Sequence, residues 1–203
     1  MTHISVLNND IHQAASILRD GGLIAFPTET YYGLAVDPFN EKALKRLFSI
    51  KKRSAVKPVL VLIPSREDIF RVTDAVPDAA DQLMDRFWPG PLTIVFSARK
   101  ELSLMLTGGT GTVGVRISPH PVAQALLHAY GEPLTATSAN RSGGSPAITA
   151  NEVKGIFGDD GDMVLEGGRT PGKKPSTLIT FNGNLIECIR EGCIPFSEIT
   201  QAI

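Results

Sequence analysis

Four polar segments of the sequence carry side chains that suit an anionic ligand. They are residues 27–34 with their threonines, tyrosines and one glutamate, the basic residues 51–53, Arg116, and the hydroxyl- and amide-rich residues 137–144. Each lies in or beside a predicted strand, and ligands of α/β proteins usually bind at strand ends. Alone, residues 27–34 also fit an ordinary turn, and residues 51–53 fit a solvated helix end. An arginine within a strand needs a partner for its charge, and an anion is one such partner.

A further segment is similar to the phosphate-binding P-loop. Gly167, Gly172 and Lys173 have the spacing of that motif. However, Lys174 stands where a serine or threonine would hold magnesium, and Pro175 would prevent the helix that must face the phosphates. We therefore expect a solvated basic loop, from which Lys173 and Lys174 can still approach a bound nucleotide.

Other catalytic classes find little support in the sequence. The four histidines have no usual metal-ligand spacing with cysteines or acids, and there is no Gly-x-Ser-x-Gly elbow of a serine hydrolase. His120 lies between two prolines at a predicted helix start, which favours a capping or packing role. Cys188 and Cys193 match neither a zinc knuckle nor a secreted disulfide framework, so we expect a cytoplasmic protein.

The composition is that of an ordinary globular chain. Its 203 residues are 42% hydrophobic, and 20 Lys and Arg stand against 21 Asp and Glu, so the net charge is −1. Such a balance gives no bulk attraction to nucleic acid or to anionic membranes. We expect one domain over residues 1–203, with neither a signal peptide nor a membrane span.

The hydrophobic pattern predicts alternating helices and strands. A continuous apolar run at residues 59–63 indicates a strand that is covered on both faces, and Asn182-Gly183 between two apolar runs indicates a hairpin. The expected helices are 8–20, 40–53, 79–88, 119–130 and 151–157, and the expected strands are 23–26, 32–36, 59–63, 92–96, 113–117, 134–136, 163–165, 177–181 and 185–189. The fold class is therefore α/β, a single domain with one twisted mixed sheet flanked by helices.

Taken together, these segments resemble the YrdC-type threonylcarbamoyl-AMP synthases. The matching residues are Pro27-Thr28-Glu29-Thr30-x-Tyr32-Gly33-Leu34, Lys51-x-Arg53, Trp88-Pro89-Gly90-Pro91-Leu92-Thr93, Val113-x-Val115-Arg116-Ile117-x-x-His120-Pro121, Thr137-Ser138-Ala139-Asn140-x-Ser142-Gly143, Pro175-Ser176-Thr177 and Arg190-x-Gly192. The resemblance implies an α/β fold around a concave basic cavity. It also implies a nucleotidyl transfer that joins L-threonine, bicarbonate and ATP into threonylcarbamoyl-AMP with release of pyrophosphate.

The resemblance also implies roles for the matching residues. The threonine pocket would be formed by Thr28, Tyr32, Arg116, Ser138 and Ser176, with Arg116 pairing the carboxylate. ATP would be held by Lys51, Arg53, Thr112, Ser138, Asn140 and Arg190, and Mg²⁺ would bridge its phosphates. Catalysis would come from positioning and from the charges of Lys51, Arg53 and Arg116, without a covalent nucleophile. The product would pass to a tRNA threonylcarbamoyltransferase for the t6A modification of tRNA.

Two departures from the family pattern leave alternatives open. Leu62 stands where many relatives have a histidine that touches threonine, and the chain ends at Ile203 without the additional C-terminal domain of a longer family branch. A YciO-like protein of unsettled activity is one alternative. The other is an RNA-binding or ribosome-maturation protein, which would use a basic face made of Lys51, Lys52, Arg53, Arg116, Arg141, Arg169, Lys173, Lys174 and Arg190, although few aromatic residues are present for stacking.

Overall fold

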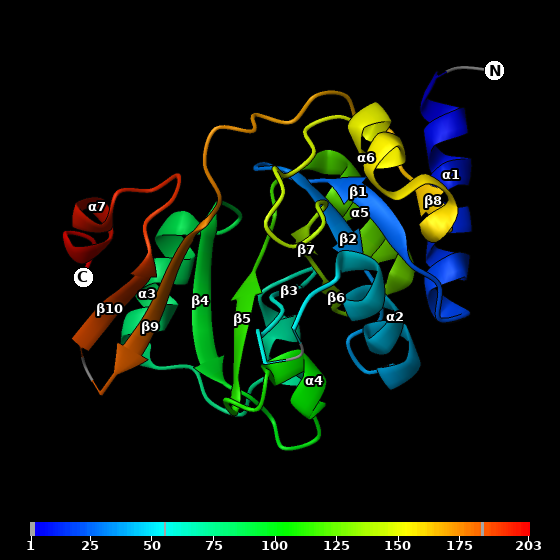
Figure 1. The fold of residues 1–203 in the computed structure, drawn as a ribbon. Helices are drawn as coiled ribbons and strands as arrows, with labels where there is room; N and C mark the ends of the chain where they lie inside the picture. Colours follow the sequence, from blue (N-terminus) through cyan, green and yellow to red (C-terminus); the bar gives the residue numbers. More distant parts are fainter. Residues whose placement is uncertain (1–2, 55, 184) are drawn as a thin grey trace.

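The computed structural model describes residues 3–54, 56–183 and 185–203, with helices and strands alternating along the chain (Figure 1). The helices are α1 His3–Arg19, α2 Glu41–Lys51, α3 Asp78–Phe87, α4 Leu104–Thr107, α5 Pro121–Tyr130, α6 Ala150–Phe157 and α7 Phe196–Thr200, with 3-10 turns η1 Glu67–Arg71 and η2 Gly158–Asp160. The strands are β1 Ile24–Pro27, β2 Tyr32–Ala35, β3 Val61–Leu62, β4 Leu92–Ser97, β5 Thr112–Arg116, β6 Leu134–Thr135, β7 Thr137–Ser138, β8 Met163–Val164, β9 Thr177–Asn182 and β10 Leu185–Arg190. None of the described helices combines the length and the hydrophobicity that crossing a bilayer requires.

The strands form two mixed sheets, whereas the sequence pattern predicted one. Four strands pair in the order β7-β2-β1-β8, and six pair in the order β10-β9-β4-β5-β3-β6. The α/β class and the flanking helices are confirmed. The expected strand 134–136 is divided instead: β6 pairs with β3 in the larger sheet, and β7 pairs with β2 in the smaller one. The chain therefore crosses from one sheet to the other at Ala136.

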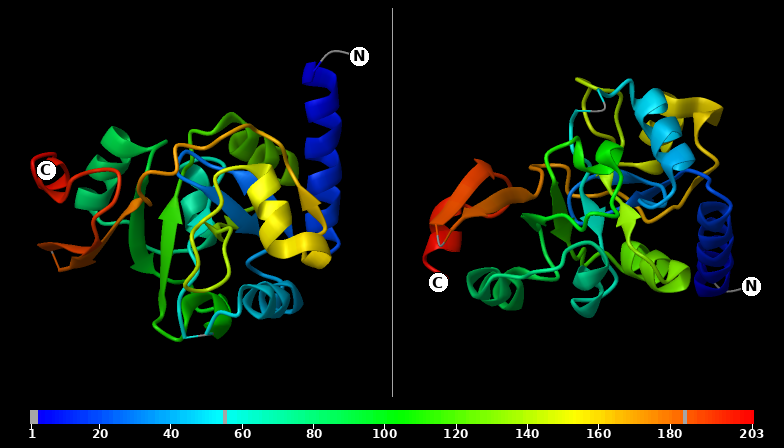
Figure 2. Two further views of the ribbon diagram at one scale, coloured as in Figure 1. Left: turned by 45° about the horizontal axis from the view of Figure 1, so that its top comes forward. Right: turned by 90° about the horizontal axis from the view of Figure 1, so that it is seen from below.

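The smaller sheet is covered on both faces by helices. Ile24 and Phe26 of β1 pack with α1 and α5, while Leu23 and Ala25 face the core that includes α2 and α6. This alternation is the period of two that an extended strand imposes on its side chains. Figures 1 and 2 show α1 beside α5 on one side of this sheet.

Helix α2 ends at the basic residues 51–53. Asn40 caps it by accepting hydrogen bonds from the backbone N–H groups of Lys42 and Ala43 at 3.0 and 3.1 Å. The predicted apolar face is confirmed, because Ala43, Leu44, Leu47 and Phe48 are buried. The helix ends at Lys51, and Lys52 takes a left-handed conformation with φ 50°. The left-handed residue ends the helical path, so the chain changes direction directly after Lys51.

The larger sheet ends in the predicted hairpin. Asn182 of β9 pairs with Leu185 of β10, so the turn begins one residue later than expected, at Gly183 with φ 59°. Strand 59–63 is shorter than expected, since only Val61 and Leu62 pair, although Val59 and Ile63 are buried. The short helices α4 and α7 were not predicted, because four or five residues give too little periodicity to detect.

Candidate functional site

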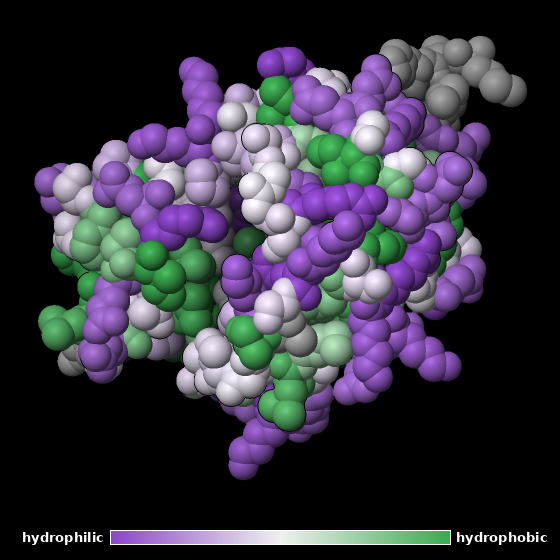
Figure 3. Space-filling model, viewed as in Figure 1, coloured by the Kyte–Doolittle hydropathy of each residue, from purple (hydrophilic) through white to green (hydrophobic). Residues whose placement is uncertain are grey.

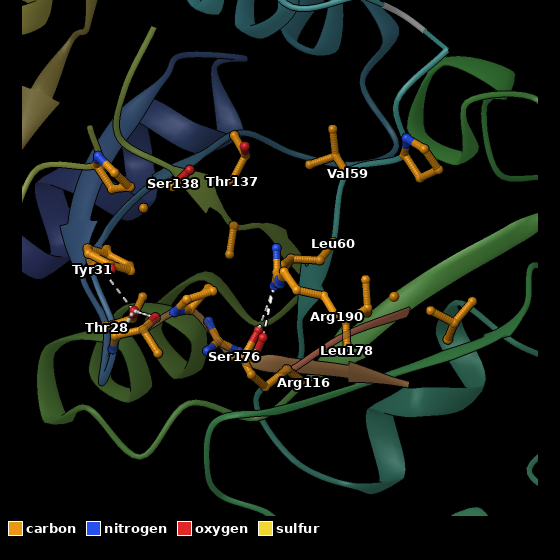
Figure 4. Close-up of a pocket in the computed structure, with 18 of the residues that line it drawn as sticks. Thr28, Tyr31, Val59, Leu60, Arg116, Thr137, Ser138, Ser176, Leu178 and Arg190 are labelled. Carbon is orange, nitrogen blue, oxygen red and sulfur yellow. Dashed lines mark hydrogen bonds between the residues drawn. The ribbon is translucent and has the colours of Figure 1, made fainter. Parts of the chain in front are cut away.

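A cavity of about 620 Å³ opens between the two sheets. The smaller sheet and its loops contribute Thr28, Tyr32 and Ser138, and the larger sheet contributes Arg116 and Arg190. Figure 3 shows the molecule hollowed near the middle of this face, with hydrophilic residues along the border. In Figure 4, Thr28, Ser176 and Arg116 lie on one side of the cavity, and Thr137, Ser138 and Val59 lie on the other.

Most of the residues expected in the site do meet in this cavity. Its lining includes Thr28, Tyr32, Arg53, Thr112, Arg116, Ser138, Ser176 and Arg190. Lys51 and Asn140 are absent from the lining and lie behind it. The expected residues therefore separate into a group that faces the cavity and a pair that supports the wall.

Arg116 is the most deeply buried cation of the cavity. Its side chain is 4% exposed, and its Nη1 donates to Oε1 of Glu29, whose side chain is 12% exposed. The second oxygen of Glu29 accepts a hydrogen bond from the hydroxyl of Ser118. The Nε of Arg116 is buried and has no hydrogen-bond partner among the described residues. A buried N–H without an acceptor is unfavourable, so this edge of the guanidinium suits an anionic ligand.

Arg190 and Ser176 form a second polar group on the same side. Arg190 donates from Nη2 to the carbonyl of Ser176 at 2.9 Å, and the hydroxyl of Ser176 lies 2.8 Å from that of Thr93 in β4. Partial desolvation and then the neighbouring Arg116 lower the pKa of Arg190. The two arginines thus lie close enough to repel each other, and an anion between them would relieve that repulsion.

Gly192 allows this group to form. A Cβ at this position would lie 2.2 Å from the carbonyl oxygen of Pro175 and 2.6 Å from the carbonyl carbon of Ser176. The backbone N–H of Gly192 donates to the Thr177 hydroxyl at 3.0 Å. Only a residue without a side chain permits this approach, which explains the glycine in the Arg190-x-Gly192 motif.

Lys51 supports the opposite wall from behind. It is 2% exposed, and its ammonium donates to the carbonyls of Ser138 and Asn140, the latter at 2.7 Å. In return, the backbone N–H of Ser142 donates to the carbonyl of Lys51 at 2.8 Å. Burial and then Arg53 lower the pKa of Lys51 to about 7. Lys51 therefore joins the end of α2 to the segment that carries Ser138.

Arg53 does face the cavity. Its Nη2 donates to the carbonyl of Pro58 at 2.8 Å, and burial lowers its pKa. Across the same end of the cavity, the hydroxyl of Thr112 lies 2.8 Å from that of Thr110. This end presents a cation and two hydroxyls, which are suitable donors to phosphate oxygens.

The loop between β1 and β2 presents hydroxyls at the remaining side. The Thr28 hydroxyl donates to the carbonyl of Tyr31 at 2.7 Å, and the Tyr32 hydroxyl donates to the carbonyl of Gly168 at 2.9 Å. Burial raises the pKa of Tyr32. The backbone N–H of Gly172 donates to the carbonyl of Thr30 at 2.9 Å. Residues 168–172 thus pack against the loop between β1 and β2. They do not form a P-loop, and the sequence had argued against one.

The charge of the lining is entirely positive. Arg53, Arg116 and Arg190 are its charged residues, and no Asp or Glu lines the cavity in the described ranges. In a confined space such charges attract and orient anions such as phosphates, carboxylates and bicarbonate.

Two other expectations are resolved by the geometry. His120 caps α5, because its Nδ1 accepts a hydrogen bond from the backbone N–H of Val122 at 3.3 Å. The basic face suggested for RNA is wrong in part, since Lys51 and Arg116 are buried at 2% and 3% exposure. Arg141 is also engaged, by Asp160 at 2.9 Å.

Several residues of the site were not identified from the sequence. Tyr31, Thr110 and Thr137 line the cavity, while Glu29 and Thr93 hold residues that line it. Glu29 and Thr93 belong to segments that match the family pattern, which was the available signal. Their roles depend on contacts with distant residues, Arg116 and Ser176, and a linear pattern does not contain those contacts.

Comparison with known proteins identifies the family. The family model Sua5/YciO/YrdC, described as "Telomere recombination", matches residues 16–192. The chain belongs to this family. It is 37% identical over 193 residues to a threonylcarbamoyl-AMP synthase of Pyrococcus abyssi, covering 95% of this chain and 57% of that protein. It is also 37% identical over 169 residues to the synthase of Coxiella burnetii, covering 83% of this chain and 90% of that protein.

Solved structures of the family have the same fold. Pyrococcus abyssi Sua5 in complex with L-threonine superposes with a TM-score of 0.93 at 36% identity, over 97% of this chain and 58% of that one. Escherichia coli YciO superposes with a TM-score of 0.83 at 29% identity, over 92% of this chain and 90% of that one. The chain thus spans a little over half of the Pyrococcus protein and most of the length of the Coxiella and Escherichia coli proteins.

Proposed function

We propose that the protein is a nucleotidyltransferase that makes threonylcarbamoyl-AMP from L-threonine, bicarbonate and ATP. The observation that carries the proposal is the cavity whose charged lining is three arginines, in a chain 37% identical to two proteins named as this synthase. All three substrates are anionic or carry an anionic group, so one cationic cavity suits them together.

The geometry supports two adjoining subsites. Threonine would lie among Thr28, Tyr32, Ser138 and Ser176, with its carboxylate at the edge of Arg116 whose Nε has no partner among the described residues. ATP would lie toward Arg53, Thr112 and Arg190, with Ser138 between the two substrates. Lys51 and Asn140 would act on the nucleotide through the segment that they hold.

The reaction then follows from placement of the reactants. The amine of threonine combines with bicarbonate, with loss of water, to give a carbamate. An oxygen of this carbamate attacks the α-phosphorus of ATP, and the bond between the α- and β-phosphates breaks to release pyrophosphate. Negative charge develops on the phosphoryl oxygens, and the arginines are placed to stabilise it.

Magnesium would enter this cavity with ATP. The lining supplies hydroxyls and arginines, and the described residues contain no group of three His, Cys, Asp or Glu side chains that could hold an ion. Oxygen atoms are the ligands that Mg²⁺ prefers, and the phosphates of ATP provide them. When bound, the ion would neutralise phosphate charge.

The reaction is tested by its products. With Mg²⁺ and ATP, pyrophosphate release should require both threonine and bicarbonate, because the carbamate is the attacking group. Each is omitted in turn from degassed buffer. Release that is independent of threonine, or ADP as the nucleotide product, would contradict the proposal. The product would be consumed by a tRNA threonylcarbamoyltransferase, and we propose the cytoplasm as the compartment.

A further inference from the structure

Glu29 lies directly behind the wall of the cavity and is outside its lining. We propose that Glu29 is a positioning residue: it holds the Arg116 guanidinium so that the Nε edge receives the carboxylate of the bound amino acid. The inference rests on the proposed function and extends it to a residue that does not itself touch substrate.

Both carboxylate oxygens of Glu29 are occupied. Oε1 accepts from Nη1 of Arg116, and Oε2 accepts from the hydroxyl of Ser118, which is fully buried. Arg116 ends β5, and Ser118 follows it two residues later. Two contacts from one carboxylate to one strand end fix both the carboxylate and the guanidinium, as a single contact would not.

The guanidinium is planar, so fixing one part of it orients the rest. With Nη1 directed at Glu29, the Nε of Arg116 is buried without a partner among the described residues. A carboxylate at this edge would supply the missing acceptor. One edge of the guanidinium would thus bind Glu29, and the other would bind the carboxylate of the ligand.

Glu29 also connects the two sheets. It lies in the loop between β1 and β2, whose neighbouring residues Thr28, Thr30 and Tyr31 line the cavity, while Arg116 belongs to the larger sheet. The ion pair therefore fixes the loop relative to the end of β5 on this side of the cavity. Loss of Glu29 would loosen both the loop and the strand end that contribute to the amino-acid subsite.

The negative charge of Glu29 affects the binding of threonine and of phosphate anions differently. Arg116 lies close enough to Arg190 to lower the pKa of that residue, and the Glu29 carboxylate offsets one of the two positive charges. Without this carboxylate the pair would attract phosphates more strongly while orienting a carboxylate less well. Binding of threonine and of a phosphate anion should then change in opposite directions.

The test measures threonine and pyrophosphate affinities by calorimetry in Glu29→Gln. We expect threonine to bind about tenfold more weakly, since a charge-assisted pair is lost, and pyrophosphate to bind as well as in the parent or more tightly. Glu29→Asp keeps the charge and should recover part of the threonine affinity. The matched control is Glu101→Gln, which removes an exposed glutamate paired with Arg99 at 3.5 Å.

A folded Glu29→Gln protein that binds threonine within about twofold of the parent would overturn the inference. If this variant does not fold, Ser118→Ala replaces it, because that change releases one of the two contacts of Glu29 without removing a charge. Threonine affinity should then fall several-fold, and an unchanged affinity overturns the inference equally.

Nuclear magnetic resonance separates this inference from the proposed function. Should the parent itself fail to bind threonine, the proposed function fails, and the side-chain ¹⁵N signals of Arg116 still report on Glu29. In the parent the ion pair should slow guanidinium rotation and separate the Nη signals, and in Glu29→Gln they should merge. Identical Arg116 spectra in the two proteins would show that Glu29 does not hold the guanidinium.

Discussion

The Arg116 guanidinium pairs with a protein carboxylate while its side chain lines the cavity. Glu29 takes Nη1, and Nε is left buried without a partner among the described residues. This division needs a side chain with several N–H groups in one plane. A lysine offers a single ammonium, which can satisfy Glu29 or reach a ligand but cannot present a planar edge to each.

Replacing Arg116 with lysine should therefore impair threonine use while preserving the fold. The buried charge of Glu29 keeps a cationic partner, so unfolding should change little. We expect kcat/KM for threonine to fall on the order of 10²-fold because a bidentate pair is lost. Steady-state rates at saturating ATP measure this, with Arg99→Lys as a surface control. Equal threonine dependence in parent and variant would remove Arg116 from the amino-acid subsite.

Lys51 should make stability depend on pH. Its pKa is lowered from an ordinary value near 10.5 to about 7 by burial and then by Arg53. Between these two values the unfolded chain binds the proton and the folded chain does not, so the free energy of unfolding rises with pH across this window. The neutral amine still has two N–H groups for the carbonyls of Ser138 and Asn140.

In Lys51→Met this rise should be reduced by up to about 1 kcal/mol per pH unit. Urea unfolding at several pH values between 7 and 10 measures the slope for parent and variant. Lys52→Met is the control, because Lys52 is the next residue and is exposed. Parallel slopes in the parent and in Lys51→Met would mean that Lys51 stays charged throughout.

The sequence located the site better than it assigned the residues within it. Arg116, Arg53 and Arg190 line the cavity as expected, since each follows or ends a predictable element. Lys51 does not line it, because its neighbour Lys52 turns the chain with φ 50° and Lys51 remains within the buried face of α2. Lys51 and Arg53 are only two residues apart, so their positions in the sequence do not show which of them lines the cavity and which lies behind its wall.

At the scale of elements, the end of β10 depends on close backbone contact with residues 175–177. Gly192→Ala would place a Cβ 2.2 Å from the Pro175 carbonyl oxygen, and backbone atoms must move to relieve it. The same segment carries Ser176, which accepts from Arg190. Stability and substrate binding should therefore fall together.

We expect Gly192→Ala to lose about 1–3 kcal/mol of unfolding free energy and to raise the KM for substrates. Gly155→Ala is a control of opposite sign: a Cβ there meets nothing within 4 Å, and alanine favours the helix α6 in which it lies. Denaturant unfolding and steady-state kinetics of both variants check this. A Gly192→Ala protein as stable as the parent would refute the close approach.

The hydrophobic pattern predicted the long elements and missed how they divide into sheets. Helix α2 and strands β4, β5 and β9 lie where their patterns placed them. Residues 134–138 did not reveal that β6 and β7 join different sheets, because each strand has two residues and its partner is distant in sequence. Pairing between remote strands is a property of the whole chain, which local periodicity does not encode.

For the whole molecule, the cavity is the junction of the two sheets. Ala136, where the chain crosses between them, lines the cavity together with Ser138 from one sheet and Arg116 from the other. A ligand that contacts both walls binds the folded arrangement and has no equivalent site in the unfolded chain. Binding should therefore raise the free energy of unfolding of the entire domain.

Thermal unfolding separates the synthase from a protein that only binds polyanions. At about 100 times their dissociation constants, ATP or threonine should each add about 2.7 kcal/mol, which corresponds to roughly 5–11 °C in Tm for a chain of this length. ATP with Mg²⁺ and threonine together should exceed either alone, because the two proposed subsites adjoin and can be filled at the same time. A polyphosphate of equal total charge is the control: it can pair with Arg53 and Arg190, but it lacks the amino acid and the nucleoside that would fill the rest of the cavity. If polyphosphate raised the Tm as much as both substrates did, general anion binding would account for the cationic cavity. That result would favour the RNA-binding alternative over the synthase.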